Sequence, residues 1–184
     1  MRGRYVHSIR ALAVAGITLI TACDGSDPTA AALFEPMPAH PSSAASSQPF
    51  VVVITGHANP DFSQGPCNVV NEEAGTGIGQ HLGAVSWASE EIANFCVDPN
   101  DPQRAEVTGA FTMTAANGDQ ITGTYVTAVL ADFAAGTLTA DGEFVIAGGT
   151  GRFAEASGSG AVRVTGSLLP PFDVAGTFAG TITY

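Results

Sequence analysis

Cysteine and histidine are the residue types in this 184-residue chain that are best suited to nucleophilic or metal chemistry. The three cysteines are Cys23, Cys67 and Cys96, and two of the four histidines, His57 and His81, lie beyond residue 49. These two histidines do not stand in HxxxH or HxH spacing, and a protein zinc site takes three or four ligands. We therefore expect no metal site.

Four glutamates stand in two adjacent pairs, Glu72 with Glu73 and Glu90 with Glu91. Carboxylates can bind Ca²⁺ together with backbone oxygens, but the sequence around these pairs lacks the spacing of a calcium loop. We interpret both pairs as exposed charges in loops or at strand ends.

A glycine motif at residues 149–154 matches the GxGxxA dinucleotide-binding fingerprint. That fingerprint requires a helix after it, but Gly158 and Gly160 interrupt any helix and only 30 residues follow Ala154. The motif therefore predicts a sharp turn, and we expect no cofactor. Serine hydrolase chemistry is not indicated either, because Ser159 lacks the GxSxG elbow.

Basic residues are rare: there are six, all of them arginine, against seventeen acidic residues. A nucleic-acid-binding domain needs a basic face, and Walker-type nucleotide hydrolases and Schiff-base enzymes need a lysine. The composition excludes these classes, and we expect no nucleic-acid partner.

The first 22 residues have the form of a secretory signal, with three arginines before an apolar run at residues 11–22. This run is shorter than the roughly 20 residues of a membrane-spanning helix. Its ending, Ile20-Thr21-Ala22-Cys23, resembles the lipobox of bacterial lipoproteins. The resemblance implies cleavage before Cys23, acylation of Cys23 and anchoring in a membrane of the bacterial cell envelope, on its extracytoplasmic (periplasmic) side. Ordinary signal cleavage near Ala22 is the alternative.

Cleavage before Cys23 leaves three arginines and seventeen acidic residues, a net charge of −14. Attachment to the membrane would then come from acyl chains rather than from attraction to anionic lipid. Residues 23–49 are rich in Pro, Ala and Ser and cannot bury a core. We interpret them as a flexible tether that holds a domain at residues 50–184 clear of the membrane.

Residues 50–184 alternate apolar and polar side chains over short runs, as half-buried strands do. The clearest runs are 50–54, 105–115, 121–129, 137–146, 162–168 and 177–184, and the weaker ones are 78–88 and 91–97. Asn117-Gly118 is typical of a type I′ hairpin turn. We predict an all-β fold of about eight antiparallel strands closed into a barrel, which removes exposed sheet edges.

An eight-stranded barrel encloses either packed side chains or one small ligand. Inward-facing aromatic residues fit both interiors, and plain core packing is the alternative to a cavity wall. The candidate cavity-lining residues are Phe111, Tyr125, Phe144, Phe178, His81 and Trp87.

Cys67 and Cys96 remain as an even pair once Cys23 serves as the anchor. Outside the cytoplasm such a pair indicates a disulfide. Two buried free thiols are the alternative interpretation.

Residues 148–160 read Gly-Gly-Thr-Gly-Arg-Phe-Ala-Glu-Ala-Ser-Gly-Ser-Gly. This segment resembles the GGTGxFxxAxG turn of the allene oxide cyclase/dirigent barrel superfamily, and residues 115–120 and 81–83 resemble motifs of its bacterial secreted members. The resemblance implies an eight-stranded antiparallel barrel, often a homotrimer, with an apolar cavity. Plant members steer cyclisation or radical coupling of small hydrophobic substrates. The catalytic residues of the cyclase do not map onto this chain.

Three functions are compatible with these observations. The first is a membrane-tethered barrel that binds a small apolar ligand or has a structural role, without catalysis. The alternative is an isomerase- or cyclase-like enzyme, in which buried polar groups such as His81 or Glu106 would face aromatic residues across a cavity. The third is a surface interaction module, whose barrel would be packed solid.

The lipoprotein hypothesis makes a direct prediction for Cys23→Ala. Acylation needs the thiol and the new amino group of Cys23, so this variant should incorporate no labelled palmitate. The matched variant Ser26→Ala should be labelled like the wild type. Metabolic labelling and immunoprecipitation measure the difference, and label retained by Cys23→Ala would contradict the hypothesis.

Overall fold

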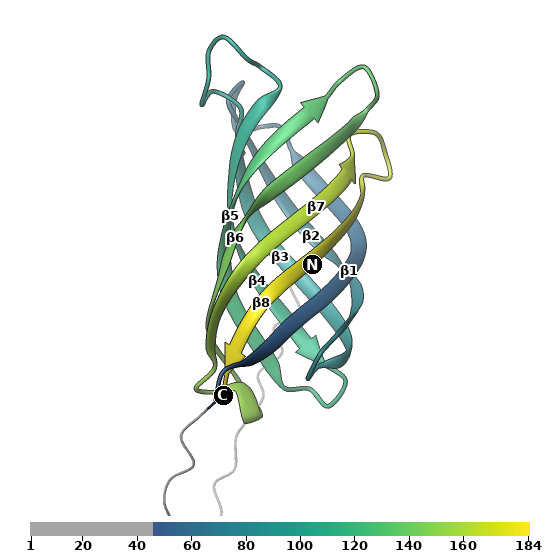
Figure 1. The fold of residues 1–184 in the computed structure, drawn as a ribbon. Helices are drawn as coiled ribbons and strands as arrows, with labels where there is room; N and C mark the ends of the chain where they lie inside the picture. Colours follow the sequence, from purple (N-terminus) through teal and green to yellow (C-terminus); the bar gives the residue numbers. More distant parts are fainter. Residues whose placement is uncertain (1–45) are drawn as a thin grey trace, which may run out of the picture. The chain divides into compact units, whose positions relative to one another are not determined.

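The computed structural model describes residues 46–184, so the expected signal, Cys23 and most of the expected tether lie outside the described residues. Within them, eight antiparallel strands follow one another in sequence order and close into a barrel (Figure 1). The prediction of an all-β, eight-stranded antiparallel barrel is confirmed. No helix in this part of the chain is long and apolar enough to cross a membrane.

Each strand pairs with its neighbours in the sequence, and β1 also pairs with β8 to close the barrel. The elements are β1 Gln48–Asp61, β2 Asn68–Gly79, β3 Gly83–Asn94, β4 Arg104–Ala115, β5 Gln120–Asp132, β6 Thr137–Gly149, the 3₁₀ turn η1 Gly151–Phe153, β7 Ser157–Ser167 and β8 Asp173–Thr183. The connections after β1, β3, β5 and β7 lie at one end, which we call the mouth. The other connections, η1 and the C terminus lie at the opposite end, the closed end (Figure 1).

The two weaker strand predictions, 78–88 and 91–97, are wrong in their bounds. The turn between β2 and β3 falls inside the first of them, and β3 ends at Asn94. Apolar alternation does not identify β2, because after Val69 its inward positions carry Asn71, Glu73 and glycines instead of apolar side chains. A strand with such an inner face lacks the alternation of apolar and polar side chains by which the other strands of the barrel are predicted.

The half of the barrel nearest the closed end is packed with large side chains. Phe50, Met113, Ile121, Phe153 and Ile182 are all inaccessible to solvent there. Burying a side chain of this kind stabilises a fold by about 1.5–3 kcal/mol. The packed half therefore supplies a rigid floor for whatever lies toward the mouth.

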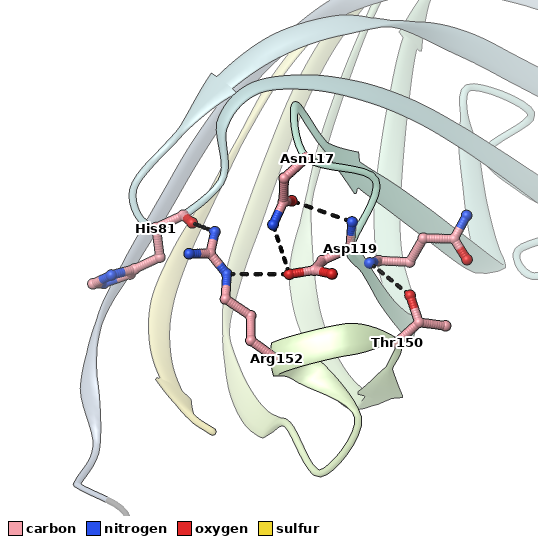
Figure 2. A network of polar contacts seen from close by, with 6 residues as sticks. His81, Asn117, Asp119, Thr150 and Arg152 are labelled. Carbon is pink, nitrogen blue, oxygen red and sulfur yellow. Dashed lines mark hydrogen bonds and ion pairs between the residues drawn. The ribbon is translucent and has the colours of Figure 1, made fainter.

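A polar network joins the three connections of the closed end (Figure 2). Arg152 of η1 donates to the backbone carbonyl of His81 and lies 3.6 Å from Asp119, measured from Nε to Oδ2. Asn117 Nδ2 donates to the same Asp119 oxygen at 2.8 Å. Gly151 has a φ of +58°, and a Cβ at this position would lie 1.8 Å from Asp119 Oδ1. The glycine motif thus forms a tight turn against Asp119.

The hairpin between β4 and β5 differs from the predicted type I′ turn. Gly118 has a φ of +89°, whereas Asn117 keeps a negative φ. The Gly118 N–H donates to the Ala115 carbonyl, and the Ala115 N–H donates to the Asp119 carbonyl. This pattern is a type I turn followed by a left-handed glycine, the usual form of a three-residue hairpin loop.

The predicted disulfide between Cys67 and Cys96 is confirmed. It joins the β1–β2 connection to the β3–β4 connection, and the Phe95 N–H donates to the Cys67 carbonyl beside it at 2.7 Å. The bond therefore fixes two loops of the mouth to each other.

Removal of this disulfide should destabilise the barrel. Its cysteines are 29 residues apart, and closing a loop of that length stabilises by roughly 3–4 kcal/mol in the chain-entropy model. Urea unfolding of the wild type and of the double variant Cys67→Ser/Cys96→Ser measures the loss. Equal unfolding midpoints, or free thiols at Cys67 and Cys96 in the isolated wild type, would contradict this expectation.

Candidate ligand cavity

The mouth half of the barrel encloses a cavity of about 140 Å³. It extends from the aromatic residues of the barrel interior to Phe62, Leu168 and Phe172 in the loops of the mouth. An engineered apolar cavity of about 150 Å³ is large enough to bind benzene. The space therefore matches one ring-sized molecule.

The aromatic residues singled out in the sequence form most of the cavity floor. Trp87, Phe111, Tyr125 and Phe178 line the cavity. Phe144 is not among the lining residues: it is 1% exposed, and its ring centroid lies 5.3 Å from that of Phe178. Phe144 thus packs beneath the cavity and supports the rings that border it.

His81 and Glu106 do not reach the cavity, so their placement in its wall is corrected. His81 lies in the β2–β3 turn at the closed end, with a φ of +65°, and its Nε2 lies 3.0 Å from the Pro49 carbonyl oxygen. Glu106 is exposed because it occupies an outward position of β4, between inward Ala105 and Val107.

Six polar residues from β2, β3 and β5 line the cavity: Asn71, Glu73, Ser89, Glu91, Tyr125 and Thr127. The interpretation of both glutamate pairs as exposed charges is therefore wrong for one member of each pair. Successive side chains of a strand point to opposite faces. Glu72 and Glu90 accordingly point outward, and Glu73 and Glu91 point into the lumen.

Glu91 is held by two donors. The Tyr125 hydroxyl donates to Oε2 at 2.5 Å, and Asn71 Nδ2 donates to Oε1 at 2.9 Å. Burial raises the pKa of the Tyr125 hydroxyl, and the nearby Glu91 charge raises it further. Tyr125 therefore keeps its proton and remains a hydrogen-bond donor to Glu91.

Glu73 lies beside this pair and accepts a hydrogen bond from Ser89 Oγ to Oε2 at 3.3 Å. Burial raises the pKa of Glu73 to about 8, and the charge of Glu91 acts in the same direction. At neutral pH the cavity thus contains a predominantly protonated Glu73 next to Glu91.

Tyr125 reaches Glu91 by passing over a glycine. In register, Gly109 of β4 stands between Tyr125 of β5 and Glu91 of β3. A Cβ on Gly109 would lie 2.5 Å from Tyr125 Cζ and 2.9 Å from Glu91 Cβ. An inward glycine between an acid and a tyrosine is a signal for this site, but reading it requires the strand register.

The fold and the cavity define a class: a closed eight-stranded antiparallel barrel whose lumen combines an apolar wall with two partly buried glutamates. No family model, curated protein or solved structure matches the chain. Residues 46–184 contain no group of three or more His, Cys, Asp or Glu side chains placed to hold a metal ion.

Glu73→Gln should remove a pH dependence of stability. The pKa of Glu73 rises from its ordinary 4.5 to about 8 on folding, so the folded state binds this proton more tightly than the unfolded state. The resulting stabilisation is complete below about pH 4.5 and is lost as the pH rises toward about 8.

Urea unfolding between about pH 4 and pH 9 tests this expectation. The free energy of unfolding of the wild type should fall relative to that of Glu73→Gln by a few kcal/mol across the window. Glu72→Gln changes the outward neighbour and should follow the wild type. Parallel curves for the wild type and Glu73→Gln would show that Glu73 is not protonated in the fold.

Proposed function

We propose that this chain is a membrane-tethered, extracytoplasmic β-barrel that binds one small apolar molecule in its lumen. The observation that carries the proposal is the cavity of about 140 Å³ above a fully packed floor. Atoms that line an unfilled space lose dispersion contacts on one side. A bound apolar molecule restores these contacts, which gives the cavity an affinity for such ligands.

The composition of the wall supports an apolar ligand. Beyond the aromatic floor, Val107, Val129, Ala140, Val162 and Val174 contribute aliphatic surface from five different strands. A purely structural or interaction role would favour a solid interior, as in the closed half. The cavity therefore favours ligand binding over a structural module.

The proposals of a membrane tether and of an extracytoplasmic location are based on the amino-terminal sequence. The lipobox-like ending at Cys23 and the Pro/Ala/Ser-rich residues 23–49 support attachment to a membrane of the cell envelope. The Cys67–Cys96 disulfide is compatible with an oxidising compartment. The resemblance to the allene oxide cyclase/dirigent superfamily supports the same apolar cavity and suggests a trimer.

An isomerase- or cyclase-like enzyme is the second candidate function. The observation that favours it is the partly buried cluster of Glu73, Glu91 and Tyr125 beside the apolar wall. A protonated carboxyl group in an apolar site is a competent general acid. If the protein is an enzyme, molecules recovered from the wild type and from Glu73→Gln should be different isomers, whereas a binder should yield the same molecule from both.

Filling the cavity should abolish ligand binding. Ala140→Phe places a ring inside the lumen, and Ala147→Phe places the same ring on the outer face of the same strand, β6. We expect Ala140→Phe to weaken toluene binding more than about tenfold in NMR titrations, whereas Ala147→Phe binds like the wild type. Circular dichroism checks folding, and Val107→Leu is the milder variant if Ala140→Phe does not fold.

Two results would contradict the proposal. One is a folded Ala140→Phe protein that binds toluene with wild-type affinity. The other is a wild-type protein that binds no toluene and releases no apolar compound when it is purified and examined by mass spectrometry.

A further inference from the structure

We propose that the ligand of this cavity is an amine: a small apolar molecule whose protonated amino group is directed at Glu73 and Asn71. This inference rests on the proposed function, because it names the chemical class of the ligand in the same cavity. Three independent features of the lumen carry it.

The first feature is the balance of donors and acceptors. Tyr125 and Asn71 donate to Glu91, and Ser89 donates to Glu73. The Oδ1 atom of Asn71 is buried and has no hydrogen-bond partner. A buried acceptor without a donor is costly, and an ammonium group offers three donors and no acceptor. The ammonium group of an amine ligand would supply the donor that Asn71 Oδ1 lacks.

The second feature is charge. Each arginine from residue 46 onward pairs with an aspartate outside the lumen, and so does His57. Among the described residues that line the cavity, Glu73, Glu91 and Tyr125 are the titratable ones, and none is basic. Two partly buried acids with no cation beside them favour a positively charged partner.

The third feature is the aromatic floor. Trp87, Phe111 and Tyr125 border the same cavity as the acids. A cation within about 6 Å of such a ring face is attracted to it, most strongly in a site shielded from water. An amine with an apolar body thus fits both the acids and the rings.

The groups around Glu73 determine whether its carboxyl group is protonated before and after a ligand binds. The groups that face it are Ser89 and Glu91 from β3, Asn71 from its own strand and Tyr125 from β5. On the other side of Glu73, strand β1 contributes Ala58 and Pro60 to the cavity wall, and neither side chain titrates. When an ammonium group binds, the O–H bond of the Glu73 carboxyl group breaks and its proton passes to solvent, whereas the ligand keeps its own protons and no other bond changes.

Binding of three ring-sized probes to the purified protein tests the inference. Benzylamine, benzyl alcohol and toluene share the ring and differ in the group attached to it. At about pH 7.5, we expect benzylamine to bind roughly tenfold more tightly than benzyl alcohol in calorimetric titrations, the size of a charged hydrogen bond. The affinity for benzylamine should rise from about pH 6 to about pH 8 as Glu73 gives up its proton more easily, and that for toluene should stay constant.

Substitution at Glu73 gives a second readout. Glu73→Gln should reduce benzylamine binding about tenfold, whereas outward Glu72→Gln should leave benzylamine and toluene binding unchanged. If Glu73→Gln does not fold, the three probes on the unmodified protein still decide.

The outcomes separate this inference from the proposed function. Toluene and benzyl alcohol binding as tightly as benzylamine would overturn the amine and leave an apolar ligand site. Failure of all three probes to bind would overturn both.

Discussion

The narrow lumen of an eight-stranded barrel is the constraint on which the rest of this structure depends. Such a barrel is just wide enough for side chains to fill it. A large ring on one strand must therefore lie over a neighbouring position that has no side chain. Phe111 lies over Gly123, and Tyr125 lies over Gly109, with a hypothetical Cβ within 2.6 Å of the ring in each case. Glycine in the interior of a strand destabilises it. At these two inward positions, however, glycine leaves the space that the rings of Phe111 and Tyr125 occupy.

The same constraint divides the barrel into a packed half and an open half. Large side chains from several strands meet near the closed end, whereas Ala58, Ala93 and Ala140 occupy inward positions nearer the mouth and leave space. The acids lie at the border of this space, where burial removes water from Glu73. Their protonation and hydrogen bonding therefore follow from the width of the lumen as much as from the residues themselves.

The sequence predicts most of the fold because β4 to β8 carry apolar side chains at many alternate positions, as in Val107, Phe111 and Met113. It predicts the acidic side of the cavity poorly for the same reason. Asn71 and Glu73 interrupt the apolar alternation of β2. The polar residues that form the acidic side of the cavity therefore also make their own strand hard to predict from the sequence. Tyr125 is recognisable as inward, but its partner Glu91 lies two strands away and is found only from the register.

The charge of the whole barrel acts in the same direction as the charge inside it. Residues 46–184 carry three arginines against fourteen acidic residues. A field of this sign raises the local concentration of cations and their rate of association, and salt screens it over about 10 Å. Contacts inside the cavity are screened much less. For an amine ligand, the outer charge should therefore govern arrival and its dependence on ionic strength, whereas Glu73 and Asn71 govern how long the ligand stays. A site built in this way selects against carboxylates twice, first at the surface and then in the lumen.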